Sequence, residues 1–213
     1  MARIGGWAAV VAGVTGVAGA VFLLVVPPAA SPDVFNYPLS PTGFVVVQVA
    51  FGIHHVLTAV ALWAFWRAGF AGRGRFADAA GLSAAATMAM LGVWELVVIS
   101  GNGAPYPSDD LVWIDVGYGT LSLLSGVALV LLGVAAVRAR VLAGVWRWVV
   151  LAIGIWVFVP MTPALAGGFV LGRVAIGTWL LLFALLGWAM LRWATDAAPR
   201  RSSPAVAAEG GAS

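Results

Sequence analysis

Six apolar runs, each long enough to cross a lipid bilayer, dominate this chain of 213 residues. A helix needs about 20 apolar residues for this, because it rises about 1.5 Å per residue through a hydrocarbon core about 30 Å thick. The runs cover residues 4–26, 43–66, 76–99, 112–137, 146–159 with its continuation, and 168–193. The pattern predicts an all-α polytopic membrane protein with a six-helix transmembrane domain over residues 1–195.

Two of the runs, the first and the fifth, have features that do not fit a simple membrane span. The first follows Arg3 and precedes the sequence PAAS, as a signal peptide would, but it is longer than the roughly 7–15 apolar residues of a signal-peptide core. We therefore expect a retained helix. In the fifth run, Pro160 and Pro163 are expected to end the helix early, because proline has no amide N–H to donate.

The composition agrees with a chain that is surrounded by lipid. Hydrophobic residues make up 62% and charged residues only 9%, whereas soluble domains carry about 25% charged residues. Such a chain cannot cover a globule with polar surface, so we expect the lipid bilayer as its partner. The chain has no cysteine, which excludes disulfides, thiolate metal sites and cysteine nucleophiles.

The arginines indicate how the chain is oriented. In the six-span prediction, every arginine except Arg173 falls on one side of the bilayer, and the chain has no lysine. An excess of basic residues marks the cytoplasmic side. We therefore expect a multi-pass protein of a bacterial plasma membrane with both termini in the cytoplasm, and no nucleic-acid partner. The Ala-, Ser-, Pro- and Gly-rich tail, residues 196–213, is predicted to be disordered and cytoplasmic.

A short motif recurs at the outer start of three runs. PLSP precedes GFVVVQVAFG at 43–52, PMTP precedes GFVLGRVAIG at 168–177, and DVGYG stands at 115–119. The shared core is a polar residue, valine, a small residue, a bulky residue and glycine, and it begins at Gln48, Asp115 and Arg173. This predicts three helical hairpins related by an internal repeat. Chance similarity between apolar segments is the alternative.

The repeat places polar side chains at one depth of the membrane. Gln48, Asp115 and Arg173 each lie about five residues, or roughly 7 Å, inside the outer start of a helix. Glu95 lies at the same depth in the third run. Ionisable groups within spans normally face the bundle interior and pair there. We therefore expect a buried polar cluster in which Arg173 pairs with Asp115 or Glu95.

The only two histidines are adjacent, in FGIHHVLT at 51–58. Neighbouring helical residues point about 100° apart, so the two rings cannot share a partner. His55 lies seven residues after Gln48 and is expected to join the polar cluster, whereas His54 is expected to face another helix or pack against Thr58. A metal site needs at least three converging ligands, so none is predicted. No nucleophile–base pair is evident, and no catalytic residue is predicted.

Three functions remain open on this sequence. The cluster of Gln48, His55, Glu95, Asp115 and Arg173 can join helices by hydrogen bonds in a structural or partner-binding membrane module, with a membrane-protein partner or a second copy. It can also serve a proton-linked small-solute transporter, since histidine titrates near neutral pH. The third possibility is a haem-binding subunit of a membrane redox system, with haem b between His55 and Met88. The first two functions require no cofactor.

Two segments, YPLSPTGF and FGIHH, occur in a six-span chain whose basic residues are all arginine. Together these features resemble those of a known group of proteins. The chain resembles a group of six-helix integral membrane proteins of actinobacteria to which no activity is attached. The resemblance implies a membrane-embedded helical fold and assigns no catalytic or binding residue.

Overall fold

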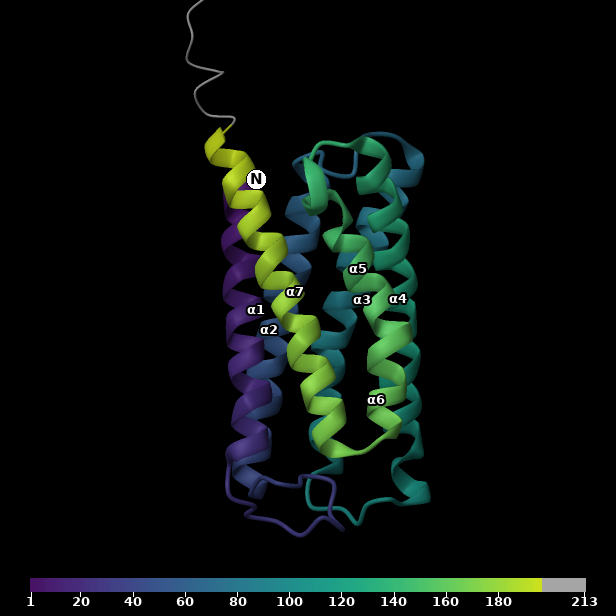
Figure 1. Cartoon of the computed structure of the whole chain (residues 1–213). Coiled ribbons are helices and arrows are strands. Elements are labelled where there is room, and N and C mark those ends of the chain that lie inside the picture. The colour runs from purple at the N-terminus through teal and green to yellow at the C-terminus, as the bar shows by residue number, and fades with distance from the viewer. Residues whose placement is uncertain (197–213) are drawn as a thin grey trace, which may run out of the picture.

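A computed structural model describes residues 1–196 and shows an elongated bundle of helices (Figure 1). In chain order the elements are α1 (Ala2–Val25), α2 (Pro41–Arg67), α3 (Arg75–Val98), η1 (Ile99–Gly101), η2 (Asp109–Leu111), α4 (Val112–Ala139), η3 (Gly144–Trp148), α5 (Val149–Trp156), η4 (Val157–Met161), α6 (Thr162–Ala166) and α7 (Phe169–Asp196). No strand occurs in the described residues, and the all-α prediction is confirmed.

The six predicted spans correspond to six helices that are long and apolar enough to cross a membrane. The helix ends differ from those of the predicted runs by a few residues. For example, α2 begins at Pro41, because the Ser40 hydroxyl caps it by accepting a hydrogen bond from the Gly43 amide. The predicted tail lies outside the described residues, apart from Asp196 at the end of α7.

The fifth span does not end at its prolines, so that expectation is wrong. The helical path runs from Gly144 to Ala166 and passes Pro160 in a π-helical turn, η4, before Pro163 enters the first turn of α6. Pro163 is tolerated there because the first amides of a helix need no intrahelical acceptor. The Thr162 hydroxyl donates to the Val157 carbonyl over 2.7 Å, which adds a partner at the distorted turn.

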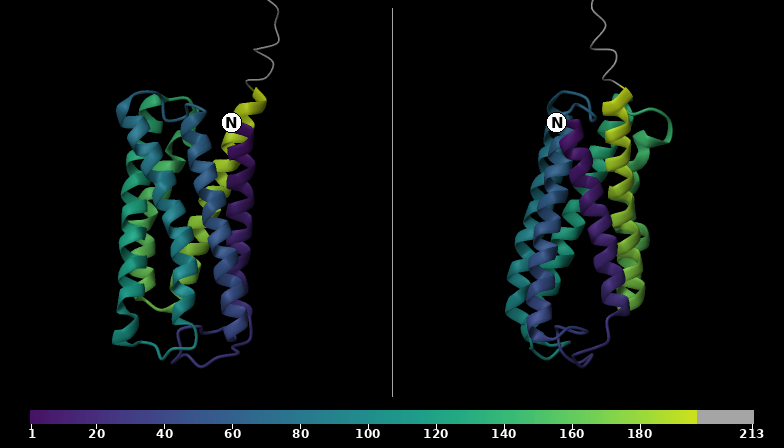
Figure 2. Two further views of the ribbon diagram at one scale, coloured as in Figure 1. Left: turned by 180° about the vertical axis from the view of Figure 1, so that it is seen from behind. Right: turned by 90° about the vertical axis from the view of Figure 1, so that its left-hand side faces the viewer.

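The helices form a ring in which each one packs against its neighbours in sequence, and α7 closes the ring by packing along α1 (Figures 1 and 2). The most extensive helix pairs are α1 with α7 and α2 with α3, so the predicted grouping into three hairpins is not confirmed. α7 also contacts the fifth span along α5, η4 and α6. Two indole hydrogen bonds join α5 and α7, from Trp156 to the Ala175 carbonyl and from Trp179 to the Ile153 carbonyl, each 3.0 Å long.

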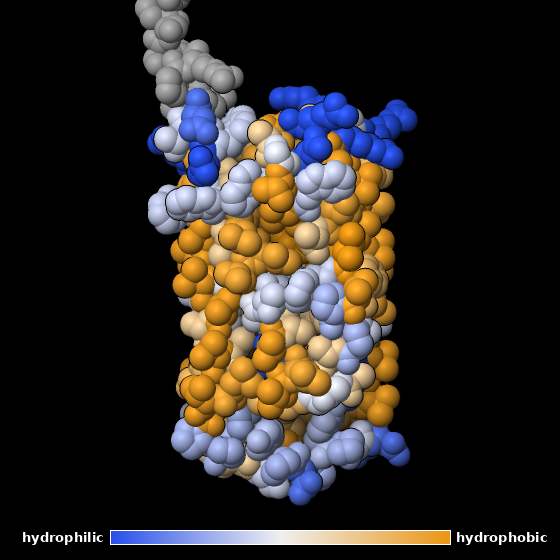
Figure 3. Space-filling view, in the orientation of Figure 1, coloured by the Kyte–Doolittle hydropathy of each residue, from blue (hydrophilic) through white to orange (hydrophobic). Residues whose placement is uncertain are grey.

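The surface shows a broad apolar band with hydrophilic residues at both ends (Figure 3). Large apolar side chains such as Ile53, Val93 and Leu181 are exposed within this band, as expected for a lipid-facing surface. The interior holds one large apolar core, which includes the fully buried Phe65 and Phe183, and a smaller one at the opposite end of the bundle from the N-terminus. We call the end with the N-terminus the arginine-rich end and the other end the loop end.

At the loop end, the connections α1–α2 and α3–α4 bind each other and cover the bundle (Figure 2). The Phe35 amide donates to the Ala104 carbonyl over 3.0 Å, and the Tyr106 amide donates to the Asp33 carbonyl over 2.8 Å. Asn36, which is 2% exposed, accepts from the Gly103 amide. We call residues 26–40 and 99–111 the loop cap. It closes the loop end over the site described below.

Candidate functional site

Two glycines bring α2 and α3 together in the loop-end half of the bundle. A Cβ atom on Gly52 would lie 3.1 Å from the Gly92 carbonyl oxygen, and a Cβ atom on Gly92 would lie 3.1 Å from the Gly52 carbonyl oxygen. Such close backbone approach requires small residues. His55 and Glu95 follow the two glycines by three residues each, and because α2 and α3 are antiparallel they lie on opposite sides of this crossing. Side chains lean toward the N-terminus of their helix, so the two lean toward each other and approach to 3.6 Å.

Glu95 is the centre of a group of four polar side chains, three of which are joined by hydrogen bonds. The residue is 5% exposed, and its Oε1 atom lies 3.6 Å from Nδ1 of His55. Its Oε2 atom accepts a short hydrogen bond from the Tyr118 hydroxyl of α4. The same hydroxyl accepts from Nε2 of Gln48 over 3.4 Å. We call Gln48, His55, Glu95 and Tyr118 the Glu95 cluster, which links α2, α3 and α4.

The imidazole of His55 has its protonation pattern set by the backbone. Nδ1 lies 2.9 Å from the Phe51 carbonyl oxygen. A carbonyl can only accept, so Nδ1 carries the hydrogen and Nε2 is the nitrogen that can take a second proton. Protonation of Nε2 would place a positive charge beside the Glu95 carboxylate. A proton bound at either residue would therefore change the charge that the other one faces.

The structure confirms part of the predicted cluster and corrects the rest. Gln48, His55 and Glu95 lie together, as expected. Asp115 does not belong with them: it is exposed, and it accepts from the Tyr106 hydroxyl of the loop cap over 3.3 Å. No acidic group lies within 4.0 Å of Arg173 in residues 1–196, so the predicted pair is not in direct contact, although Arg173 lies near enough to Glu95 and Tyr118 to interact with both through its charge.

Local side-chain geometry explains the position of Arg173. A long side chain on a helix leans toward the N-terminus of that helix. Arg173 accordingly lies over the ring of Phe169, one turn earlier in α7, with Cζ 5.2 Å from the ring centroid. Its cation is thus satisfied in part by an aromatic face rather than by a carboxylate.

Tyr118 is the member of the cluster that sequence reasoning missed. The repeat drew attention to its first, polar position, which in α4 is Asp115. Tyr118 occupies the bulky position of the same motif, where the other two copies have Phe51 and Ile176. Only the tyrosine has a hydroxyl, and that difference within the repeat was the available signal.

His54 packs against a neighbouring helix, as predicted. It is buried, and its Nε2 atom would lie 2.8 Å from a Cβ atom placed on Gly16 of α1. That nitrogen has no hydrogen-bond partner. Thr58 contacts the backbone of His54 rather than the ring, because its hydroxyl donates to the His54 carbonyl over 3.0 Å.

The geometry gives little support to cofactor ligation at His55 and Met88. Met88 is fully buried among apolar side chains of the large core, one turn from Gly92 and further from the loop end than Glu95. His55 faces Glu95 instead. Within residues 1–196, no three His, Asp or Glu side chains converge as a metal site would require. The haem hypothesis stays a prediction without a fitting pair of ligands.

Tyr106 in the loop cap provides a pH-dependent contact outside the membrane spans. Burial, and then the charge of Asp115, raise the pKa of its hydroxyl above the ordinary value. The folded protein thus favours the neutral phenol. The stability that the fold gains from keeping Tyr106 neutral is fully present below about pH 10, and it is lost as the pH rises through the raised pKa.

We expect Asp115→Asn to lower the pKa of Tyr106 toward its ordinary value, but not fully, because burial remains the larger cause. The tyrosinate absorbance at alkaline pH measures this, with Tyr106→Phe identifying the signal. Asp109→Asn is the matched control, because Asp109 is exposed and makes no bond to Tyr106. An equal pKa in the wild type and in Asp115→Asn would contradict the contact.

The fold and the site together define a class, a six-helix membrane-type bundle with a buried carboxyl–imidazole–phenol cluster in one half. No protein-family model matches the chain. No curated protein and no solved structure matches it either. The resemblance to actinobacterial membrane proteins therefore stays a prediction, and any function must be inferred from the site alone.

Proposed function

We propose that this chain is an integral membrane protein that binds a proton reversibly at His55 and Glu95 and uses it in proton-linked transport of a small solute. One observation carries the proposal: the Glu95 carboxyl is buried within a membrane-length helix, beside an imidazole and a phenol, and Arg173 acts on it through its charge without a direct ion pair in the described residues. Acidic groups placed in this way typically mark proton or solute pathways.

A transporter also requires a part of the structure that can move. We infer that the seam between α5 and α7, where the two indole hydrogen bonds join the helices, is this part. The π-helical turn η4 lies beside the seam, and such turns are frequent at functional sites. α7 also carries Arg173. We infer that opening at this seam would expose the cluster. We also propose that the arginine-rich end faces the cytoplasm of a bacterial cell.

Proton binding can be tested without knowing the solute. In reconstituted protein, the infrared carbonyl stretch of a protonated carboxyl should titrate with pH, and Glu95→Gln should remove that band. Asp115→Asn is the matched control, since Asp115 is also in the loop-end half but exposed. Retention of the band in Glu95→Gln would contradict proton binding at Glu95.

Proton movement is tested separately, in liposomes that contain a pH-sensitive dye. After an external acid pulse, wild-type protein should acidify the lumen faster than protein-free liposomes do. Glu95→Gln and His55→Gln should bring the rate down to the protein-free level, whereas His54→Gln should not, because the His54 ring faces α1. A wild-type rate equal to that of empty liposomes would refute transport even if the carboxyl titrates.

The second candidate is a structural or partner-binding membrane module. It is favoured by one specific observation, that the Glu95 cluster joins three helices under a closed loop cap. Its partner would be another membrane protein or a second copy of the chain. This candidate predicts that the cluster variants change stability while proton movement stays at the level of empty liposomes.

A further inference from the structure

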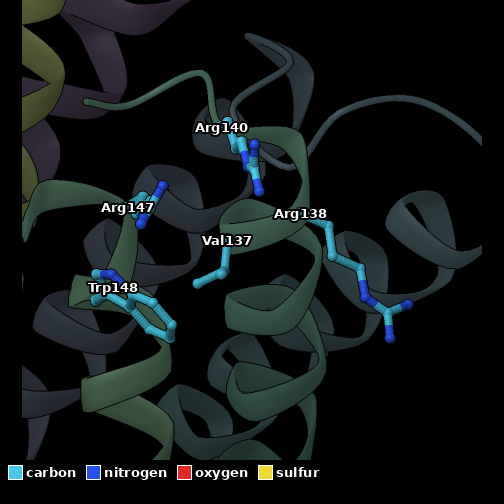
Figure 4. Close-up of a pocket in the computed structure, with 5 residues that line it drawn as sticks. All are labelled: Val137, Arg138, Arg140, Arg147 and Trp148. Atoms are coloured by element: carbon cyan, nitrogen blue, oxygen red, sulfur yellow. The ribbon is translucent and has the colours of Figure 1, made fainter. Parts of the chain in front are cut away.

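A hollow at the arginine-rich end lies between the end of α4 and η3 (Figure 4). Its volume is about 500 Å³, and it is lined by Val137, Arg138, Arg140, Arg147 and Trp148. None of the three arginines has an acidic group within 4.0 Å in residues 1–196. The hollow thus concentrates positive charge without an anion from the described part of the protein.

Arg140 occupies a backbone conformation that disfavours it. It ends α4 with φ 54° and ψ 25°, and it is the only non-glycine residue with a positive φ among the described residues. Glycine is the usual residue at such a helix end, and an L-residue there costs about 1 kcal/mol or more. Figure 4 shows the Arg140 side chain directed into the hollow. A cationic side chain is thus present here although the backbone conformation is unfavourable for it.

Arg147, on the opposite side of the hollow, has a buried donor without an acceptor. Its Nε atom is buried and makes no hydrogen bond to any of residues 1–196, and its Cζ atom lies 5.5 Å from the centroid of the Trp148 ring. Buried polar groups almost always have a partner, and a charged donor without one is costly. The unpaired nitrogen therefore points to an anion that completes the site.

Membrane orientation alone does not explain this arrangement. The positive-inside tendency requires only arginines near helix ends, and Arg138 fits that simple role. Its guanidinium turns away from the hollow in Figure 4 and lies 5.8 Å from the ring centroid of Phe76 on α3. Orientation does not require two further arginines to face one hollow, one from a strained backbone and one with a buried, unpaired donor.

We propose that Arg140 and Arg147 bind the phosphate of an anionic phospholipid head group. Arginine binds phosphate well because its planar guanidinium offers two parallel donors. The neighbouring Trp148 is 45% exposed, and indole rings favour the head-group level of a bilayer. At this end the hydrophilic residues border the apolar band of the surface (Figure 3), so acyl chains of the bound lipid would continue along lipid-facing helices. This position favours a lipid over a free phosphate ion.

The test measures ligand-dependent thermal stability of the full-length protein in detergent. A ligand that binds only the folded state raises Tm with its concentration. We expect phosphatidylglycerol to raise the Tm of the wild type more than phosphatidylcholine or inorganic phosphate does. In R140Q/R147Q the phosphatidylglycerol concentration needed for half the effect should rise roughly tenfold or more, because charge-assisted hydrogen bonds are lost. R3Q is the matched control, because Arg3 is an exposed arginine at the same end and outside the hollow.

Each outcome decides the proposal. Selective loss of the phosphatidylglycerol effect in R140Q/R147Q, with R3Q unchanged, supports it. An equal loss in R3Q, or equal effects of the two lipids on the wild type, would show that general charge or detergent exchange is responsible and would overturn it. Protection by inorganic phosphate as strong as that by phosphatidylglycerol would overturn the choice of a lipid.

If the double variant does not fold, R147K takes its place. It keeps the charge but loses the two-donor geometry, and an unchanged phosphatidylglycerol effect would overturn the proposal.

Discussion

Gly187→Val should lower the free energy of unfolding by about 3 kcal/mol, because it inserts a side chain between two backbones. A Cβ atom on Gly187 of α7 would lie 2.5 Å from the Gly6 carbonyl oxygen and 2.6 Å from the Val10 amide nitrogen, both in α1. Neither backbone atom can rotate away, so the two helices must separate. The α1–α7 contact closes the ring, so the loss would affect the whole bundle.

The measurement is unfolding by sodium dodecyl sulfate in mixed micelles, followed by circular dichroism. Gly119→Val is the matched control. Gly119 is also a helical glycine, but a Cβ atom there meets no atom within 4 Å. Its valine variant should stay within about 0.5 kcal/mol of the wild type. If the two variants lost similar amounts of stability, intrinsic helix propensity rather than close packing would be the cause, and the described α1–α7 contact would be contradicted.

The second large effect is expected at Tyr118. Tyr118→Phe removes one hydroxyl and leaves Glu95 without its hydrogen-bond donor and Gln48 without its acceptor. A buried group left without its partner costs about 1–3 kcal/mol, and the cost is higher for charged groups. We therefore expect the free energy of unfolding to fall by about 2 kcal/mol, measured in the same micelle assay.

Tyr37→Phe is the control for this change. Tyr37 lies in the loop cap, where its ring contacts Phe169 with a centroid distance of 5.5 Å, and its hydroxyl makes no hydrogen bond in residues 1–196. Its phenylalanine variant should be near neutral. A double-mutant cycle of Tyr118→Phe with Glu95→Gln should show coupling of about 1 kcal/mol or more, since the two side chains contact each other. Additive losses would show that the two side chains act independently and would refute the cluster as a unit.

These predictions connect the packing of the bundle to its proposed activity. If Tyr118→Phe destabilises the protein and Glu95→Gln stops proton movement, the cluster serves both purposes. If the first result holds and wild-type protein moves no protons, the structural module is the better description. The phospholipid site is independent of both, because it lies at the other end of the bundle from the Glu95 cluster.

Most members of the Glu95 cluster could be predicted from the sequence. The spacing of Gln48 and His55 along one helix put them on one face, and Glu95 stood out as an acidic residue in a long apolar run. Depth along a helix follows from residue number, so three of the four members were found. Direction around the helix axis was less certain, and this uncertainty explains the error at Asp115, which is exposed. Arg173 lies over Phe169 and interacts with Glu95 only at a distance, through its charge.

The number of spans and the all-α class follow from the sequence alone, because the length of an apolar run and the thickness of a bilayer leave few alternatives. Which polar groups meet depends instead on how the helices pack. Gly52 and Gly92 set the distance between α2 and α3, and the rotation of α4 turned Tyr118 rather than Asp115 toward Glu95. Helix rotation and closure of α7 onto α1 depend on the fit of many small side chains at once, and no local pattern in the sequence encodes that fit.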